Sequence, residues 1–134
     1  TDFGDLSAAK TNTTGLSSST RGVVGGGSTP SKLNVMEYVT ISSTGDVSDF
    51  GDMSISAATR ASVCTLTRGV FAGGATPSTS DVIDYITIAS TGNAADFGDL
   101  ITGRKGWTGG ISDSHGGIWS RLNWLYSKHR IIIY

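Results

Sequence analysis

The chain has 134 residues, which is enough for one domain and short for two. Its 10 basic and 11 acidic side chains give a net charge of −1, which argues against a protein that binds nucleic acid by bulk electrostatics. It has 19 glycines but only two prolines, a composition typical of a turn-rich β protein rather than a disordered Gly/Pro tract. No apolar run approaches the roughly 18 residues that a membrane-spanning helix needs.

A 47-residue repeat organises the sequence. The motif Asp-Phe-Gly-Asp at 2–5 returns at 49–52 and again at 96–99, so that successive copies are 47 positions apart. A period in the range of 20–50 residues indicates one supersecondary unit used repeatedly, with a core built between neighbours. We therefore divide the single repeat domain into repeat 1 (2–48), repeat 2 (49–95) and a partial, divergent repeat 3 (96–134).

Two strands of repeat 1 are predicted from its alignment with repeat 2. Residues 20–27 realign with 67–74, and residues 35–41 realign with 82–88. In repeat 2, residues 61–67 are rich in β-branched and small side chains and suit a strand. Cys64 lies in this run; because it is the only cysteine, it cannot form an internal disulfide, and we expect a small buried hydrophobe.

The second half of repeat 2 predicts two further strands and the turns around them. A break at Arg68-Gly69 leads into a short strand that stops at the Gly73-Gly74 pair, before a polar loop. Residues 82–88 are nearly all β-branched or aromatic, and we expect this strand to be covered on both faces. A turn at 90–93 returns the chain to the strand that opens at Asp96.

These elements amount to about four short strands per 47 residues, with no helical periodicity. A single sheet of this size cannot protect both of its faces from water, so the repeats must stack. Four antiparallel strands in about 40–50 residues, marked by glycine and aromatic positions, are the pattern of a propeller blade. The predicted fold is therefore all-β, with four-stranded propeller blades.

The repeat marks resemble those of the kelch family. They are a glycine pair that ends one strand, an aromatic residue in an acidic-aromatic pair, and a second aromatic residue that opens the next strand. These structural repeat positions are Gly26, Gly27, Gly73, Gly74, Tyr38, Tyr85, Phe3, Phe50 and Phe97. In the kelch repeat such residues lock adjacent blades, so the resemblance implies packing roles for them.

Two features depart from the kelch pattern. Phenylalanine stands where kelch repeats have tryptophan, and the basic residue found at Lys10 and Arg104 is replaced by Ala57 in repeat 2. More loosely, the repeats resemble kelch-like arrays in tail-fibre and other virion proteins of marine bacteriophages. That resemblance implies a virion or extracellular location.

Repeat 3 loses the pattern after residue 117. Ser120 and Arg121 replace the glycine pair, and all three tryptophans (Trp107, Trp119 and Trp124) lie in this repeat. The change has three interpretations: a terminal cap, a contact with another copy, or a frameshift scar in the gene. Fewer than three repeats cannot close a ring, so we expect self-association, with a homodimer completing six blades.

The sequence offers no catalytic residues, metal site or cofactor site that we would assign. Asp113-Ser114-His115 holds the residue types of a triad, but contiguous residues cannot adopt its geometry. Aspartates three apart at 46–52, and their counterparts at 93–99, could gather Ca²⁺, but structural turns are the favoured interpretation. Two histidines and one cysteine make a zinc or copper site improbable.

Four residues are candidates for ligand binding. Arg21 and Arg68 occupy matching positions, expected in loops, where they could bind anions or pair with Glu37 and Asp84; we favour pairing. Trp119 and Trp124, together with Trp107, could form an adhesive patch, because aromatic side chains dominate binding hot spots; a core role for at least two of the three is the favoured interpretation. The surrounding loops would present these groups to a surface glycan or host receptor.

The function that we predict is a non-catalytic structural or binding module, part of a phage fibre or another extracellular adhesive assembly. The alternative is a carbohydrate-binding lectin or carbohydrate-active enzyme on the same propeller scaffold. An enzyme would need acidic pairs about 5–10 Å apart that converge on the channel. Positions that recur in every blade more often serve symmetry than chemistry.

Overall fold

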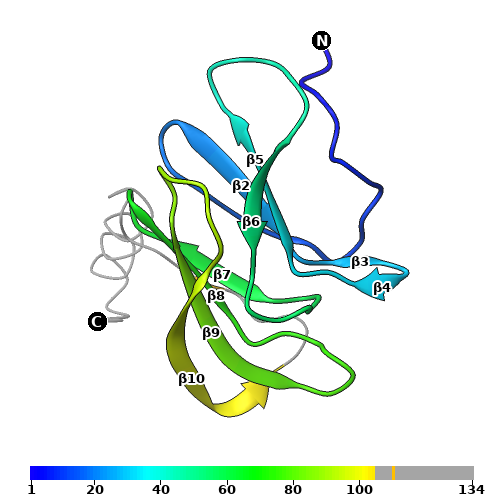
Figure 1. The fold of residues 1–134 in the computed structure, drawn as a ribbon, viewed down its shortest axis with the longest axis vertical. Coiled ribbons are helices and arrows are strands. Elements are labelled where there is room, and N and C mark those ends of the chain that lie inside the picture. The colour runs from blue at the N-terminus through cyan, green and yellow to red at the C-terminus, as the bar shows by residue number, and fades with distance from the viewer. Residues whose placement is uncertain (105–109, 111–134) are drawn as a thin grey trace, which may run out of the picture.

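The computed structural model describes residues 1–104 and 110 (Figure 1). Within these residues the chain is all-β and contains no helix, so the predicted class is confirmed. Two four-stranded antiparallel sheets account for most of the structure, and a two-stranded ribbon is formed by β3 (Ser28–Thr29) and β4 (Ser31–Lys32). The described part therefore has no helix that is long and apolar enough to cross a membrane.

The first sheet has the order β1-β2-β5-β6, in which each strand pairs with the next along the sheet. Its strands are β1 (Thr14–Ser17), β2 (Arg21–Gly25), β5 (Val35–Thr40) and β6 (Ser48–Asp52). All three pairings are antiparallel, with Leu16 opposite Val23 and Val23 opposite Tyr38. This arrangement places Leu16, Val23 and Tyr38 in one row across the sheet.

The second sheet repeats this topology in the order β7-β8-β9-β10. Its strands are β7 (Ala61–Cys64), β8 (Arg68–Ala72), β9 (Ser80–Thr87) and β10 (Ala95–Arg104). Strands β7, β8 and β10 each begin 47 positions after their counterparts β1, β2 and β6. The 47-residue period of the sequence is thus a period of the structure, and the motif that opens repeat 2 forms the last strand of the first sheet.

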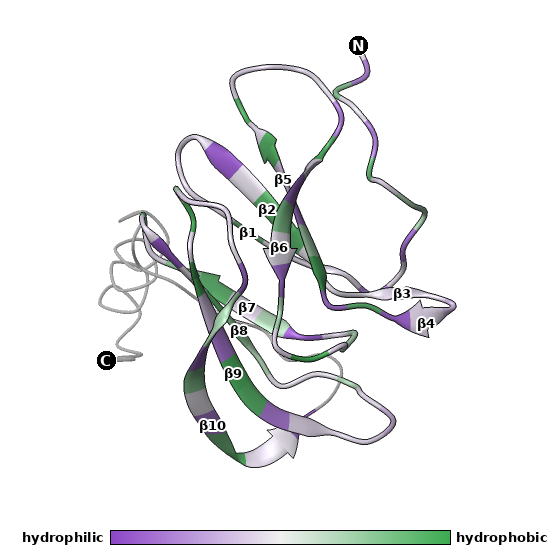
Figure 2. Cartoon of the chain, in the orientation of Figure 1, coloured by the Kyte–Doolittle hydropathy of each residue, from purple (hydrophilic) through white to green (hydrophobic). Residues whose placement is uncertain are grey.

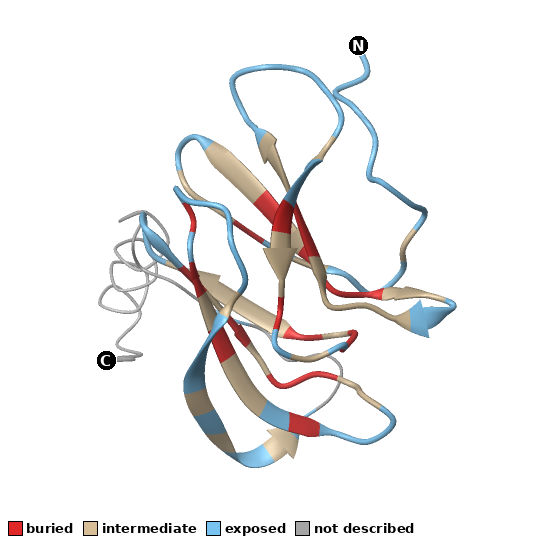
Figure 3. Cartoon of the chain, in the orientation of Figure 1, coloured by how far each residue is buried: buried red, intermediate tan, exposed pale blue. Residues whose placement is uncertain are grey.

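The hydrophobic core lies between the two sheets (Figures 2 and 3). The first sheet contributes Leu16, Val23, Met36 and Phe50, and the second sheet contributes Phe71 and Ile86. Met53 and Ile88, just beyond β6 and β9, complete the buried cluster. Cys64 packs half-buried against this cluster, and its thiol donates to the Ser17 carbonyl oxygen at 3.2 Å.

Arg21 and Arg68 are the first residues of β2 and β8, so their predicted placement in loops is wrong. The break expected at Arg68-Gly69 lies earlier, at 65–67 between β7 and β8, and β8 runs through Gly69. A Cβ atom at Gly69 would lie 2.5 Å from a methyl carbon of Leu16. The missing side chain lets the two sheets approach each other, and the strand continues through the glycine.

Candidate functional site at the junction of the sheets

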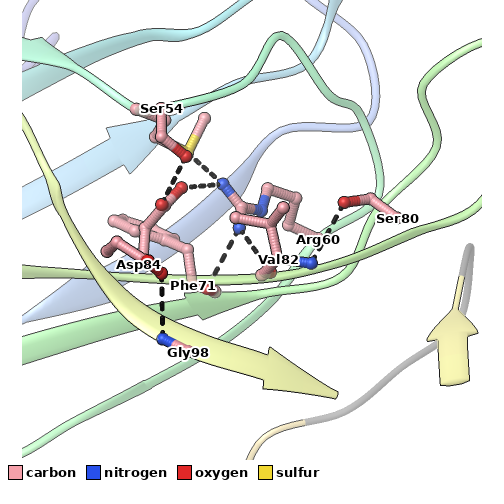
Figure 4. A network of polar contacts seen from close by, with 9 residues as sticks. Ser54, Arg60, Phe71, Ser80, Val82, Asp84 and Gly98 are labelled. Atoms are coloured by element: carbon pink, nitrogen blue, oxygen red, sulfur yellow. Dashed lines mark hydrogen bonds and ion pairs between the residues drawn. The ribbon is translucent and has the colours of Figure 1, made fainter. Parts of the chain in front are cut away.

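A buried ion pair lies at the junction of the two sheets (Figure 4). Arg60 Nη1 lies 2.5 Å from Asp84 Oδ2, and the two side chains are 1% and 0% exposed. The second terminal guanidinium nitrogen, Nη2, donates to the carbonyl oxygens of Phe71 at 3.1 Å and Val82 at 3.0 Å. Ser54 Oγ donates to Asp84 Oδ1 at 2.5 Å, so both carboxylate oxygens are engaged.

The elements that carry these groups explain their position. Asp84 lies in β9 on the face that meets the first sheet, whereas Ser54 and Arg60 belong to the segment between β6 and β7. This linker runs along the junction, where Ala57 and Ala58 are 0% and 4% exposed. The ion pair therefore ties the linker that leaves the first sheet to the third strand of the second sheet.

The same arrangement occurs one repeat earlier. Lys10 Nζ lies 2.7 Å from Glu37 Oε2, and both side chains are nearly inaccessible to solvent. Ser7 Oγ donates to Glu37 Oε1. Ser7 lies one 47-residue repeat before Ser54, and Glu37 lies one repeat before Asp84. The carboxylate and the serine thus occupy equivalent places in the two units.

The cation does not keep the same alignment. The position equivalent to Lys10 is Ala57, and the charge in the second unit comes from Arg60, three residues later. The loss at Ala57 is evident from the repeat, whereas Arg60 was not among the residues predicted from the sequence. A usable signal was available, because Asp84 falls on a predicted buried strand and a buried carboxylate requires a cation nearby.

The expected pairing of Arg21 with Glu37, and of Arg68 with Asp84, is wrong. In the register of β2 and β5, Arg21 lies opposite Thr40 and Glu37 lies opposite Val24. Side chains two apart share a face of a strand, so Arg21 and Glu37 point to opposite faces of the sheet. Arg68 and Asp84 are separated in the same way, since Asp84 lies opposite Phe71.

The two arginines instead stack on aromatic rings. The Arg21 guanidinium carbon lies 4.2 Å from the centroid of the Tyr38 ring, and that of Arg68 lies 4.9 Å from the Tyr85 ring. Arg21 Nη1 also donates to the Ile88 carbonyl oxygen at 2.9 Å, which links the first sheet to the end of β9. Cation–π contacts at such partly exposed sites contribute about 0.5–1 kcal/mol.

Aromatic pairs on the last two strands of each sheet complete these stacks. The rings of Tyr38 and Phe50 meet edge to face with centroids 6.0 Å apart, and those of Tyr85 and Phe97 meet at 5.9 Å. Each pair joins the third strand of a sheet to its outer strand. Both tyrosines therefore contribute to packing within a sheet, and Tyr38 also packs against the buried cluster between the sheets.

The glycine pairs lie where the backbone of one sheet meets the linker. Gly26 and Gly27 have φ values of 62° and 98°, which disfavour any other residue. A Cβ atom at Gly26 would lie 2.5 Å from the Ala57 carbonyl oxygen, and the Gly27 amide donates to that same oxygen at 3.2 Å. In the second unit, Gly73 and Gly74 have φ values of 64° and 119°.

The outer strand of the first sheet also binds a turn of the second sheet. The amides of Gly92 and Ala94 donate to the carbonyl oxygens of Phe50 at 2.6 Å and Asp52 at 2.8 Å. In return, the Asp52 amide donates to Asn93 Oδ1 at 3.0 Å. The Asp-Phe-Gly-Asp motif of β6 therefore pairs with β5 on one side and with a turn on the other.

The N-terminal copy of the motif makes the same three bonds one repeat earlier. The amides of Gly45 and Val47 donate to Phe3 O at 2.7 Å and Asp5 O at 3.1 Å, and the Asp5 amide donates to Asp46 Oδ1 at 3.0 Å. Asp46 thus accepts a backbone hydrogen bond within a turn. No group of three or more His, Cys, Asp or Glu side chains suited to a metal ion occurs among residues 1–104 and 110.

The remaining candidates lie outside the described residues. These are the two proposed binding tryptophans, the contiguous Asp-Ser-His segment, the substituted glycine pair and the expected terminal strand: Trp119, Trp124, 113–115, Ser120, Arg121 and 131–134. No protein-family model matches the chain, and no curated protein matches its sequence.

Proposed function

We propose that this chain is a non-catalytic structural module, a run of kelch-like propeller blades that associates with copies of itself to complete a ring. The observation that carries this proposal is the serine–carboxylate pair, which recurs at the same place in both units and binds a cation in each. A group that is repeated in each unit supports packing between neighbouring units. A reaction centre would be expected in one unit only.

The state of the buried carboxylates also supports a structural role. Glu37 and Asp84 are 2% and 0% exposed, and each is held by a cation and a serine hydroxyl. A general acid or base must reach a proton on its substrate within hydrogen-bond distance. Neither carboxylate is accessible to a dissolved substrate in this arrangement.

The arrangement of the strands supports the blade interpretation. Each sheet is a four-stranded antiparallel meander, and the two sheets pack face to face through one buried cluster. Such sheets are typical of propeller blades. The two described sheets do not by themselves close a ring, and large apolar side chains such as Phe97 and Ile101 remain exposed. Self-association would cover them.

Assignment to a phage fibre or another extracellular adhesive assembly rests on the resemblance of the repeats alone. In such an assembly, exposed loops would contact a surface glycan or host receptor. The loops around Pro30 and Pro77 are exposed and recur at the same place in both units, which makes them the first places to test for such contacts.

The solution mass measured by light scattering after size exclusion tests the proposed ring. Six blades result from two chains if residues 96–134 supply a third blade, and from three chains if each chain supplies two. We therefore expect a sharp species near two or three times the chain mass of 13.8 kDa. A monomer at every concentration would contradict the proposed self-association.

A further inference from the structure

The third copy of the Asp-Phe-Gly-Asp motif, in β10, has an open edge. Phe97 is 55% exposed and Ile101 is fully exposed, and a Cβ atom at Gly98 would have open space around it. At Gly4 and Gly51 a Cβ atom would instead overlap the carbonyl oxygen of a docked turn. Among residues 1–104 and 110, the motif in β10 therefore has a strand partner in β9 but no docked turn like the one that each of the other copies has.

The sequence contains two turns of the kind that this motif binds. They are Ser-Thr-Gly-Asp at 43–46 and Ser-Thr-Gly-Asn at 90–93. The second turn is held by β6, which is itself paired with β5. Within the described part of the chain, the segment that docks on the first turn is the N-terminal one around Gly4, which belongs to no strand. The turn at 43–46 is thus occupied by the more weakly anchored partner.

The outward face of the second sheet corresponds, one repeat later, to the inward face of the first sheet. An apolar groove of about 280 Å³ lies on the second sheet, lined in part by Val63, Val70 and Leu100 and, on the C-terminal side of the chain, by Gly110. The residues one repeat earlier are Leu16, Val23 and Met53 of the core. There the adjoining space is filled by Phe71, whose ring lies 3.6 Å from a Cβ atom built at Gly25.

The outward face of the first sheet carries the complementary side chains. Its counterparts of Phe71, Ile86 and Ile88 are Val24, Val39 and Ile41, of which Ile41 is 47% exposed. A second copy placed one repeat beyond the second sheet would therefore present apolar side chains to the groove. Such a head-to-tail contact uses different surfaces on the two copies and can propagate until a ring closes.

We propose that β10 docks on the 43–46 turn of a second copy and displaces that copy's N-terminal segment. This inference rests on the proposed self-association, in the form in which each chain supplies two blades, and names the contact that produces it. Phe97 O and Asp99 O would accept the amides of Gly45 and Val47 of the second copy. The N-terminal segment then acts as a tethered competitor, and a tethered group has an effective concentration of the order of millimolar.

Two alanine substitutions in the same motif test this contact with opposite expected results. Gly98→Ala should weaken association roughly tenfold or more, because the added Cβ would overlap the docked turn. Gly4→Ala should strengthen association to a similar extent, because it releases the N-terminal segment from the turn. Gly92→Ala is the matched control: its φ of 152° is similar to the 136° of Gly98, and its Cβ would also have open space.

The measurement is light scattering of the full chain and each variant over a series of concentrations, with circular dichroism to check the fold. Association lost in Gly98→Ala, retained in Gly92→Ala and strengthened in Gly4→Ala supports the docking. Unchanged association in a folded Gly98→Ala overturns the docking and leaves the proposed self-association standing. If Gly98→Ala does not fold, Gly4→Ala decides alone.

A wild-type monomer gives a separate result. If Gly4→Ala then associates, the docking stands and the proposed assembly of the wild-type chain fails, because the N-terminal segment keeps the turn occupied. If neither the wild-type chain nor Gly4→Ala associates, both the docking and the self-association are overturned. If the wild-type chain associates weakly, and a folded Gly4→Ala variant associates no more strongly than the wild type, the docking is likewise contradicted.

Discussion

At the residue scale, the Arg60–Asp84 pair is the most consequential contact of the described structure. Both charges are withdrawn from water, and the guanidinium also binds two backbone carbonyl oxygens. Transferring a charge into such an environment is costly unless it is paired and hydrogen-bonded. The pair therefore fixes which linker segment lies against β9, whether or not it adds to the net stability.

Asp84→Asn should destabilise the fold by about 3–5 kcal/mol, because the amide leaves the Arg60 charge buried without its counter-ion. Urea unfolding monitored by circular dichroism would measure the change in the free energy of unfolding. Asp81→Asn provides the control, because Asp81 lies in the same strand and is exposed. Equal effects of the two substitutions would contradict the assigned role of Asp84.

The cation of each unit shows the limit of reasoning by alignment. The repeat places Ala57 where Lys10 stands, which suggests that the charge is lost in the second unit. The structure keeps the charge by placing Arg60 against Asp84 from a position three residues later. The longer guanidinium side chain and the course of the linker make this substitution possible, and an alignment contains neither.

At the element scale, the motif Asp-Phe-Gly-Asp has one sequence and two structures. It forms strand in β6 and β10, where β5 and β9 supply a neighbouring strand. At 2–5 it forms none among the described residues, because only the turn at 45–47 hydrogen-bonds to it. A strand depends on its partner as much as on its own residues.

The glycine pair that follows β2 sets how closely the linker can approach the sheet. Gly26→Ala should cost at least about 1–3 kcal/mol, because it combines an unfavourable positive φ with a close contact to the Ala57 backbone. Thermal unfolding would show this as a lower Tm. In the control, Gly15→Ala, the nearest atom to the new Cβ is 3.6 Å away, and the Tm should change little.

At the scale of the whole molecule, the two sheets share one core. Phe71 of the second sheet is fully buried among residues of the first, and Phe50 lies in the same cluster. A single sheet of four short strands would leave one of these faces in water. We therefore expect the two sheets to unfold together in one cooperative transition.

Phe71→Ala tests this shared core. Removing the ring should destabilise the fold by about 3–5 kcal/mol through lost burial and the cavity left behind. Hydrogen exchange should show loss of protection in β2 and β5 as well as in β8 and β9. The exposed Leu66→Ala is the control, since its side chain is 57% accessible. Loss of protection confined to the second sheet would contradict a common core.

The sequence by itself determined the all-β class, the 47-residue period and the approximate strands, because strand patterns and turn residues are local properties that recur with the repeat. The tertiary structure decided how those strands are grouped, which cation neutralises each carboxylate and which copy of a shared motif forms a strand. It also placed Arg21 and Glu37 on opposite faces of one sheet. These outcomes depend on register and on neighbours in space, and for that reason the order of residues alone did not determine them.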